Sequence, residues 1–131
     1  MRLPLDIAKN LRLPLISAPM FLVSGPELVI AACRSGIIGS FPTANCRTLD
    51  ELDAWLGRIV GEAKGAAAFA PNLIVHKSNN RLMDGAALVA EHRAQIVIVS
   101  VGSPEPIMET IHEYGGLVLS DITSMRHAEK A

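Results

Sequence analysis

The stretch PLISAPMFLVSG, residues 14–25, holds the first residues whose types and spacing could bind a ligand. A short apolar strand leads into Ser17, Ala18, Pro19 and Met20, and an apolar helix with proline in its first turn follows. Small residues next to a proline let the backbone approach a flat ligand, because proline fixes its own φ and restricts the residue before it. An ordinary strand-to-helix turn is the alternative interpretation.

The composition favours an α/β domain. Half of the 131 residues are hydrophobic and only 4% are aromatic, a mixture typical of strands buried on both faces and covered by helices. The length predicts one domain over residues 1–131. A net charge of −1 gives no reason to expect nucleic acid or an acidic membrane surface as a partner.

The two cysteines, Cys33 and Cys46, are too few for a disulfide scaffold or a zinc knuckle, and we expect no metal site. Cys33 lies on an apolar helix face and is expected in the core. Cys46 follows a proline-containing loop and could be more accessible, but inert packing is the favoured interpretation. Asp6, Lys9 and Arg12 interrupt the N-terminus, which argues against a secretory apolar region or a membrane span. These features favour a cytoplasmic protein.

A strand followed by a helix repeats along the chain. Residues 6–10 are expected to form a short helical turn, within an opening segment 1–13, that closes one end of the domain. Strands are expected at about 14–19, 37–41, 66–75, 95–101 and 117–122, and helices at about 26–35, 49–63, 82–93, 104–113 and from 123 to 131. Thr48 and Glu51 predict a capping box at helix 49–63. Its expected buried face carries Leu49, Leu52, Leu56, Ile59 and Val60, with Trp55 packing beside it.

Alternating strands and helices argue for a parallel sheet, and two architectures fit. A doubly wound sheet of five strands would be complete at this length, whereas a (β/α)₈ barrel of roughly 250 residues would be cut off just past its middle. No glycine-rich phosphate turn follows the first strand, and SMRHAEKA at 124–131 has helical composition without a capping glycine. We therefore expect a (β/α)₈ TIM-barrel type, truncated to about the first five β/α units.

A family resemblance supports this architecture. SAPM, followed by VSGPELVIAACRSGIIGSFP, resembles the opening of the nitronate monooxygenase family, formerly grouped as 2-nitropropane dioxygenases, which are FMN-dependent (β/α)₈ barrels. NLIVHKSNNRL, VSVGSPEPI and HEYGGLVLSDITSMRHAEKA resemble successive strand-end segments of that family. The similarity covers nearly the whole chain, and its motifs fall in order.

The resemblance implies contacts to FMN. The family's Ala-Pro-Met turn lies against the isoalloxazine ring, which places Ala18, Pro19 and Met20 beside the flavin, mainly through backbone groups. The family's asparagine at the end of the third strand binds FMN, and Asn72 occupies that position. As alternatives, Asn72 could tie down a loop through its amide, and Met20 could simply pack at the mouth of the barrel.

Three weaker candidates for cofactor binding are Ser100, Asp121 and Thr123, which lie at the ends of the fourth and fifth strands. Active sites of such barrels form at the carboxyl ends of the strands, where all of these residues are expected. Asp121 could instead cap or brace the next helix.

The reaction that the resemblance implies is oxidation of an alkyl nitronate, or a similar carbanion, by FMN and molecular oxygen. The family's catalytic histidine and its phosphate-binding loops follow later strands, beyond Ala131, so no catalytic residue is assigned. We expect this chain to be the N-terminal portion of a longer enzyme and inactive alone.

Two alternatives stay open. A related flavin fold reduces enoyl thioesters with a nicotinamide donor, and fold does not determine chemistry. The chain could also be a non-catalytic interaction module, because five strands of a barrel leave two edges for self-association or for pairing with the missing C-terminal portion.

Overall fold

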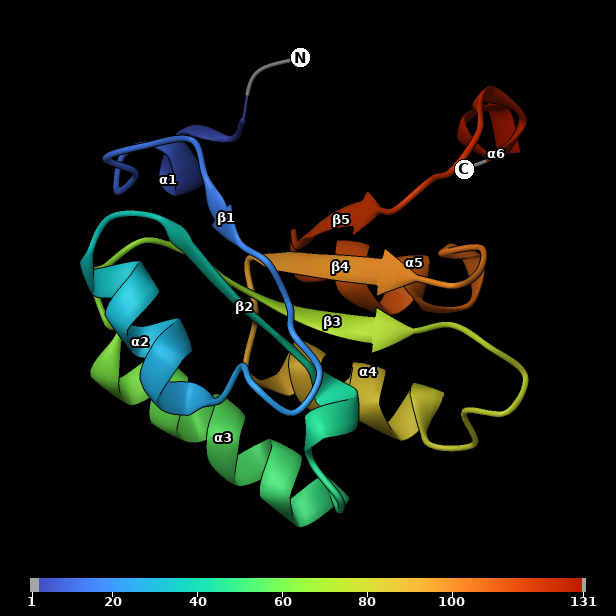
Figure 1. Ribbon diagram of the computed structural model, residues 1–131, viewed down its shortest axis with the longest axis horizontal. Helices are drawn as coiled ribbons and strands as arrows, with labels where there is room; N and C mark the ends of the chain where they lie inside the picture. Colours follow the sequence, from blue (N-terminus) through green and yellow to red (C-terminus); the bar gives the residue numbers. More distant parts are fainter. Residues whose placement is uncertain (1–2, 131) are drawn as a thin grey trace.

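The computed structural model describes residues 3–130, which fold around one parallel sheet (Figure 1). Residues 1, 2 and 131, at the ends of the expected opening segment and last helix, lie outside the described residues. The strands are β1 (Ile16–Ser17), β2 (Ile38–Pro42), β3 (Phe69–Ile74), β4 (Ile96–Ser100) and β5 (Leu117–Ser120). The helices are α1 (Leu5–Ala8), α2 (Pro26–Arg34), α3 (Leu49–Glu62), α4 (Leu82–Glu91), α5 (Glu105–His112) and α6 (Met125–Lys130), with a 3₁₀ turn, η1 (Thr43–Asn45).

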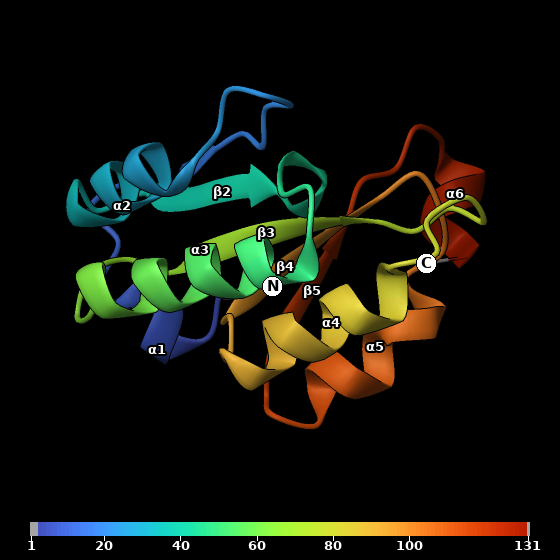
Figure 2. The same ribbon diagram turned by 90° about the horizontal axis from the view of Figure 1, so that it is seen from below.

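The strands lie in sequential order, β1-β2-β3-β4-β5, and each pairs in parallel with the next. In Figure 1, α2, α3 and α4 lie on the lower side of the sheet and α1 lies above it; Figure 2, seen from below, shows α3 and α4 in the foreground. A doubly wound sheet would reverse its strand order at a switch point and carry helices on both faces. The observed order is that of a (β/α) barrel, as predicted.

Apolar side chains alternate between two cores, because successive residues of a strand point to opposite faces. Toward the helices, Phe41 of β2 and Leu73 of β3 pack with Leu56 of α3. On the opposite face, Ile7 of α1 packs with residues that lie in β2, β3 and β4 or directly before β3. Those residues are Ile38, Ala68, Ala70 and Ile96. The turn at α1 therefore closes one end of the sheet, as expected.

The face opposite the helices becomes polar toward the carboxyl ends of the strands. Two residues after Ile38 comes Ser40, two after Ala70 comes Asn72, and the interior positions of β4 end at Ser100. Ser40 and Asn72 are buried polar residues. One end of this face is thus an apolar core and the other a layer of hydrogen-bonding side chains.

The first strand is much shorter than the predicted 14–19. Only Ile16 and Ser17 pair with β2, opposite Ile38 and Gly39. The prolines at 14 and 19 bracket these two residues, and proline has no N–H to donate to a ladder. The chain therefore leaves the sheet within two residues of Ser17.

The cap of α3 is a variant of the predicted box. The Thr48 side chain accepts a hydrogen bond from Glu51 N at 3.1 Å, as expected of an N-cap. The Glu51 carboxylate, however, accepts from Arg47 N at 2.7 Å rather than from the backbone of Thr48. The acid therefore stabilises the residue before the cap.

The buried face of α3 is narrower than predicted. Leu52, Leu56 and Ile59 are buried, but Val60 is 41% exposed. Val60 lies at the edge of the apolar face of the helix, turned away from the sheet. Trp55 packs on Phe41, with ring centroids 5.7 Å apart, so its expected packing role is confirmed. At 14 residues α3 is the longest helix described, and none within residues 3–130 could cross a membrane.

Helix α2 lies so close to β2 that only glycine fits at position 39. A Cβ on Gly39 would lie 3.0 Å from Val29 Cα and closer still to Val29 O. We expect Gly39→Ala to lower the free energy of unfolding by about 1–3 kcal/mol, because backbone would have to shift.

The matched control is Gly61→Ala in α3, where a Cβ meets nothing within 4 Å. It should raise the free energy of unfolding by about 0.5–1 kcal/mol through helix propensity. Urea titrations of both variants would check this, and equal midpoints would contradict the close approach of α2.

Candidate functional site

Asn72 and Ser100 form a hydrogen-bonded pair at the carboxyl end of the sheet. Asn72 Nδ2 donates to Ser100 Oγ at 2.8 Å and to Ile98 O at 3.2 Å. The Asn72 carbonyl accepts from Thr43 Oγ1 at 3.0 Å, and Asn72 is only 5% exposed. The side chain of Asn72 is therefore held by β4, and its backbone carbonyl by η1.

This pair has a defined donor and acceptor pattern. Because Ile98 O can only accept, the atom facing it must be the amide nitrogen, and both Nδ2 protons are used within the sheet. What the Asn72 side chain can still offer is the acceptor Oδ1. Ser100 Oγ accepts from Asn72 and keeps its own proton to donate. An acceptor and a donor thus lie side by side at the strand ends.

Met20 follows β1 at the same end of the sheet, but its backbone is fully engaged. Met20 N donates to Ser24 Oγ at 3.0 Å, and Met20 O accepts from Asn45 Nδ2 at 3.2 Å. The Met20 side chain is 40% exposed, while Ala18 is exposed and Pro19 half-buried. The resemblance implied mainly backbone contacts from Ala18, Pro19 and Met20. Because the N–H and C=O of Met20 are hydrogen-bonded within the protein, only its side chain is free to contact a ligand.

Asn45 is a residue of this region that sequence reasoning missed. It lies in η1, and its amide joins three backbone groups of the β1–α2 loop. Asn45 Nδ2 donates to Met20 O at 3.2 Å and to Ser24 O at 2.9 Å, and Asn45 Oδ1 accepts from Leu22 N at 2.8 Å. No local pattern announces these contacts, since they join residues more than 20 positions apart. Its only signal is an amide side chain in the loop after a strand.

Asp121 and Thr123 belong to a different part of the site. They line a cavity of about 500 Å³ between the β4–α5 and β5–α6 connections, together with residues such as Ser103 and His127. Thr123 Oγ1 lies 3.1 Å from His127 Nδ1. Ser124, not Asp121, accepts from the backbone of α6, at 3.3 Å from His127 N. The structure therefore groups Asp121 and Thr123 with this cavity and groups Asn72 with Ser100.

The rim of this cavity carries backbone strain. Val101 has φ +70°, in the left-handed region that β-branched residues rarely adopt. The strain comes directly after Ser100, so the chain turns sharply away from β4 at the last residue of the strand. Residues held in such conformations cluster at ligand sites.

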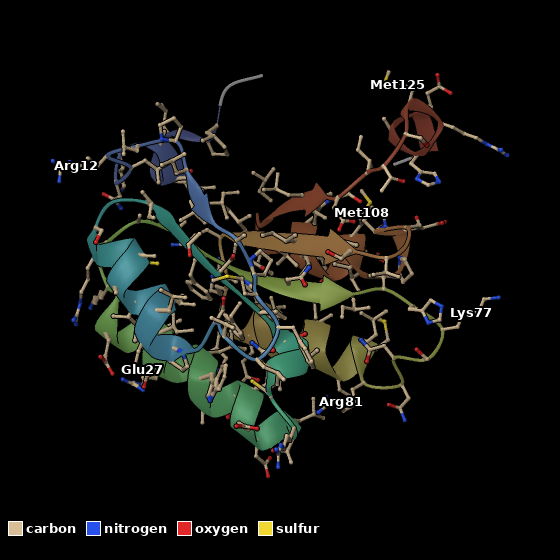
Figure 3. The ribbon with its side chains drawn as sticks, in the orientation of Figure 1. Arg12, Glu27, Lys77, Arg81, Met108 and Met125 are labelled. Carbon is tan, nitrogen blue, oxygen red and sulfur yellow. The ribbon has the colours of Figure 1, made fainter. Side chains whose placement is uncertain are left out.

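A smaller cavity of about 240 Å³ opens on the helix side, between the starts of α3 and α4. Polar groups around it are used within the protein. Thr48 caps α3, and Arg81 donates to Arg47 O at 2.9 Å and to Cys46 O at 3.2 Å. Figure 3 shows Arg81 beside the start of α3, whereas Lys77 points away from the protein. We assign no ligand to this cavity.

Inert packing, the favoured interpretation, is confirmed for both cysteines, and the alternative of a more accessible Cys46 is wrong. Both cysteines are 1% exposed. Burial raises the pKa of Cys46 to about 12, and the nearby Glu51 carboxylate adds to the shift. Burial also raises the pKa of Cys33. Within residues 3–130 no group of three His, Cys, Asp or Glu side chains could hold a metal ion.

Two solved structures share this architecture. FabK from Thermotoga maritima aligns with a TM-score of 0.80 over 96% of this chain, at 19% sequence identity. A point mutant of the same FabK aligns with the same score, coverage and identity. The FabK chains are TIM barrels. This chain has a TIM-barrel type of fold.

The likeness is limited to fold. This chain spans 40% and 42% of the length of the two FabK chains, and an identity of 19% carries no activity with it. No protein-family model matches the sequence, and no curated protein matches it. The function of the site therefore has to be inferred from the residues that form it.

The two buried thiols should be unreactive in the native state. Iodoacetamide attacks the thiolate, and a pKa of about 12 keeps Cys46 protonated at pH 8. We expect alkylation at least roughly a hundredfold slower in the native protein than in urea, rising as pH approaches 12. Mass spectrometry after timed quenching would measure it, and labelling of Cys46 at the rate of an unfolded thiol would contradict its burial.

Proposed function

We propose that the carboxyl end of this sheet forms part of an FMN site, and that the chain belongs to a flavin-dependent oxidoreductase. The observation that carries the proposal is the rigid pair of Asn72 and Ser100 at adjacent strand ends. In (β/α) barrels the carboxyl ends of the strands are where cofactor and substrate bind.

The chemistry of the available groups suits a flavin. The pyrimidine side of an isoalloxazine ring carries an N–H donor beside carbonyl acceptors. Asn72 Oδ1 would accept from that N–H, and the Ser100 hydroxyl would donate to a neighbouring carbonyl. The exposed Met20 side chain, with the small Ala18 and Pro19 before it, would cover the apolar ring. The bound FMN would supply the redox chemistry.

Asp121 and Thr123 would have a different task. They line the larger cavity with the Asp121 carboxylate and the Thr123 hydroxyl, beside the strained Val101. A cavity of about 500 Å³ has the size of a small-molecule site. We assign these two residues to the outer part of the site rather than to the flavin ring.

Two reactions are candidates for this site. Oxidation of alkyl nitronates with molecular oxygen is what the sequence motifs imply. Reduction of enoyl thioesters is the alternative, and the fold of FabK, a flavin-dependent enoyl-thioester reductase, supports it at least as well. Both use the same flavin site, so the fold does not separate them.

Flavin binding is the first test. Titration of the protein with FMN should quench flavin fluorescence in a saturable way. Asn72→Ala and Ser100→Ala should each weaken binding by at least about fivefold, because each removes a hydrogen bond to the ligand or its support. Asn80→Ala, at an exposed asparagine in the β3–α4 loop, is the control and should leave affinity unchanged. Equal affinity of all four proteins, or no quenching, would contradict the site.

The reaction is tested separately, with FMN added in excess. Oxygen uptake that depends on an alkyl nitronate would favour nitronate oxidation. Bleaching of the flavin absorbance by a nicotinamide donor without oxygen would favour the reductase. FMN binding with neither reaction would agree with the expectation that these residues are inactive alone, and either reaction would contradict that expectation.

A further inference from the structure

We propose that Asn45 is a positioning residue, which locks the β1–α2 loop and thereby presents Met20 to the flavin. This inference rests on the proposed FMN site. Asn45 need not touch the ligand, since its amide is occupied by Met20 O, Ser24 O and Leu22 N.

Apart from hydrogen bonds within the loop, from Val23 N and Ser24 N to Met20 O at 3.2 and 3.0 Å, little else holds its tip. Phe21, Leu22 and Val23 are 64%, 78% and 65% exposed, so no apolar core anchors the tip. Leu22 has φ +59°, in the left-handed region that costs a residue with a Cβ. A strained and exposed apolar tip persists only where other bonds determine it. The hydrogen bond from Leu22 N to Asn45 Oδ1 acts at the strained residue itself.

A second contact closes the loop from within. Ser24, which is 1% exposed, accepts from Met20 N at 3.0 Å through its hydroxyl oxygen. Asn45 thus links the carbonyl of Met20, which also accepts from Val23 N and Ser24 N within the loop, to η1, while Ser24 Oγ holds the N–H of Met20. With both backbone groups held, the direction of the Met20 side chain is set by its rotamer alone.

The lock is connected to Asn72. Asn45 lies in η1 with Thr43, and Thr43 Oγ1 donates to Asn72 O at 3.0 Å. One hydrogen-bonded path therefore runs from the Ser100–Asn72 pair through η1 to Met20. The two proposed flavin contacts, Met20 after β1 and Asn72 on β3, share a common support although β2 lies between these strands. Asn45 therefore positions Met20 relative to Asn72.

Hydrogen exchange tests the lock without any flavin. Asn45→Ala should speed exchange of the Leu22 amide by roughly tenfold, because that N–H loses its acceptor. Asn45→Asp keeps an acceptor oxygen and should restore most of the protection of Leu22. The matched control is Asn79→Ala, since Asn79 ties the neighbouring β3–α4 loop through Ile74 O and Arg81 N. Asn79→Ala should speed hydrogen exchange in the β3–α4 loop and leave the exchange rates of residues 20–24 unchanged.

Unchanged exchange at Leu22 in Asn45→Ala would overturn the lock. Were Asn45→Ala to unfold, Ser24→Ala would replace it, with faster exchange expected at the Met20 amide; unchanged exchange there would likewise count against a locked loop.

A double-mutant cycle between Asn45 and Met20 tests the link to the flavin. Asn45→Ala and Met20→Ala should each weaken FMN binding by roughly fivefold, and the double variant should bind within about twofold of Met20→Ala. Additive losses would show that Asn45 does not act through Met20. Protection at Leu22 that depends on Asn45, in a protein that does not bind FMN at all, would refute the flavin site while the lock itself stands.

Discussion

The site depends on one constraint: residues that alternate along each strand divide the sheet into a helix-covered face and an opposite face. On the opposite face, Ile38, Ala70 and Ile98 precede Ser40, Asn72 and Ser100 by two positions each. A shift of one residue in the register of β3 would turn Asn72 toward the helix-side core. Burial of the apolar residues on this face therefore sets the register that places the three polar side chains at the carboxyl ends of the strands.

This arrangement explains how short segments can make a site. The Asn72 amide is oriented by a carbonyl of β4, and the Met20 backbone by η1 and Ser24, so each proposed contact is held by an element other than its own. Support of this kind keeps a binding group in place before the ligand arrives, which lowers the entropy lost on binding. Pairing of the outer edges of β1 and β5 with a second copy or another chain stays a prediction.

The sequence predicted the order and type of every strand and of the helices α2 to α5, because apolar periodicity, caps and glycine stops are local. It also placed Asn72 at a strand end. It failed where contacts between distant segments decide, since Asn45 holds a loop that precedes it by more than 20 residues. Pro14 and Pro19 are evident in the sequence, but the predicted strand 14–19 did not take account of the N–H groups that they lack.

The most direct test of the account is to map FMN onto the backbone by ¹⁵N–¹H correlation spectra of the labelled protein. The account predicts that shift changes cluster at the strand ends, at Ala18, Met20, Asn72 and Ser100. Changes confined to the helix side, around Thr48 and Asn79 at the smaller cavity, or no changes at saturating FMN, would contradict a flavin site at the carboxyl end of this sheet.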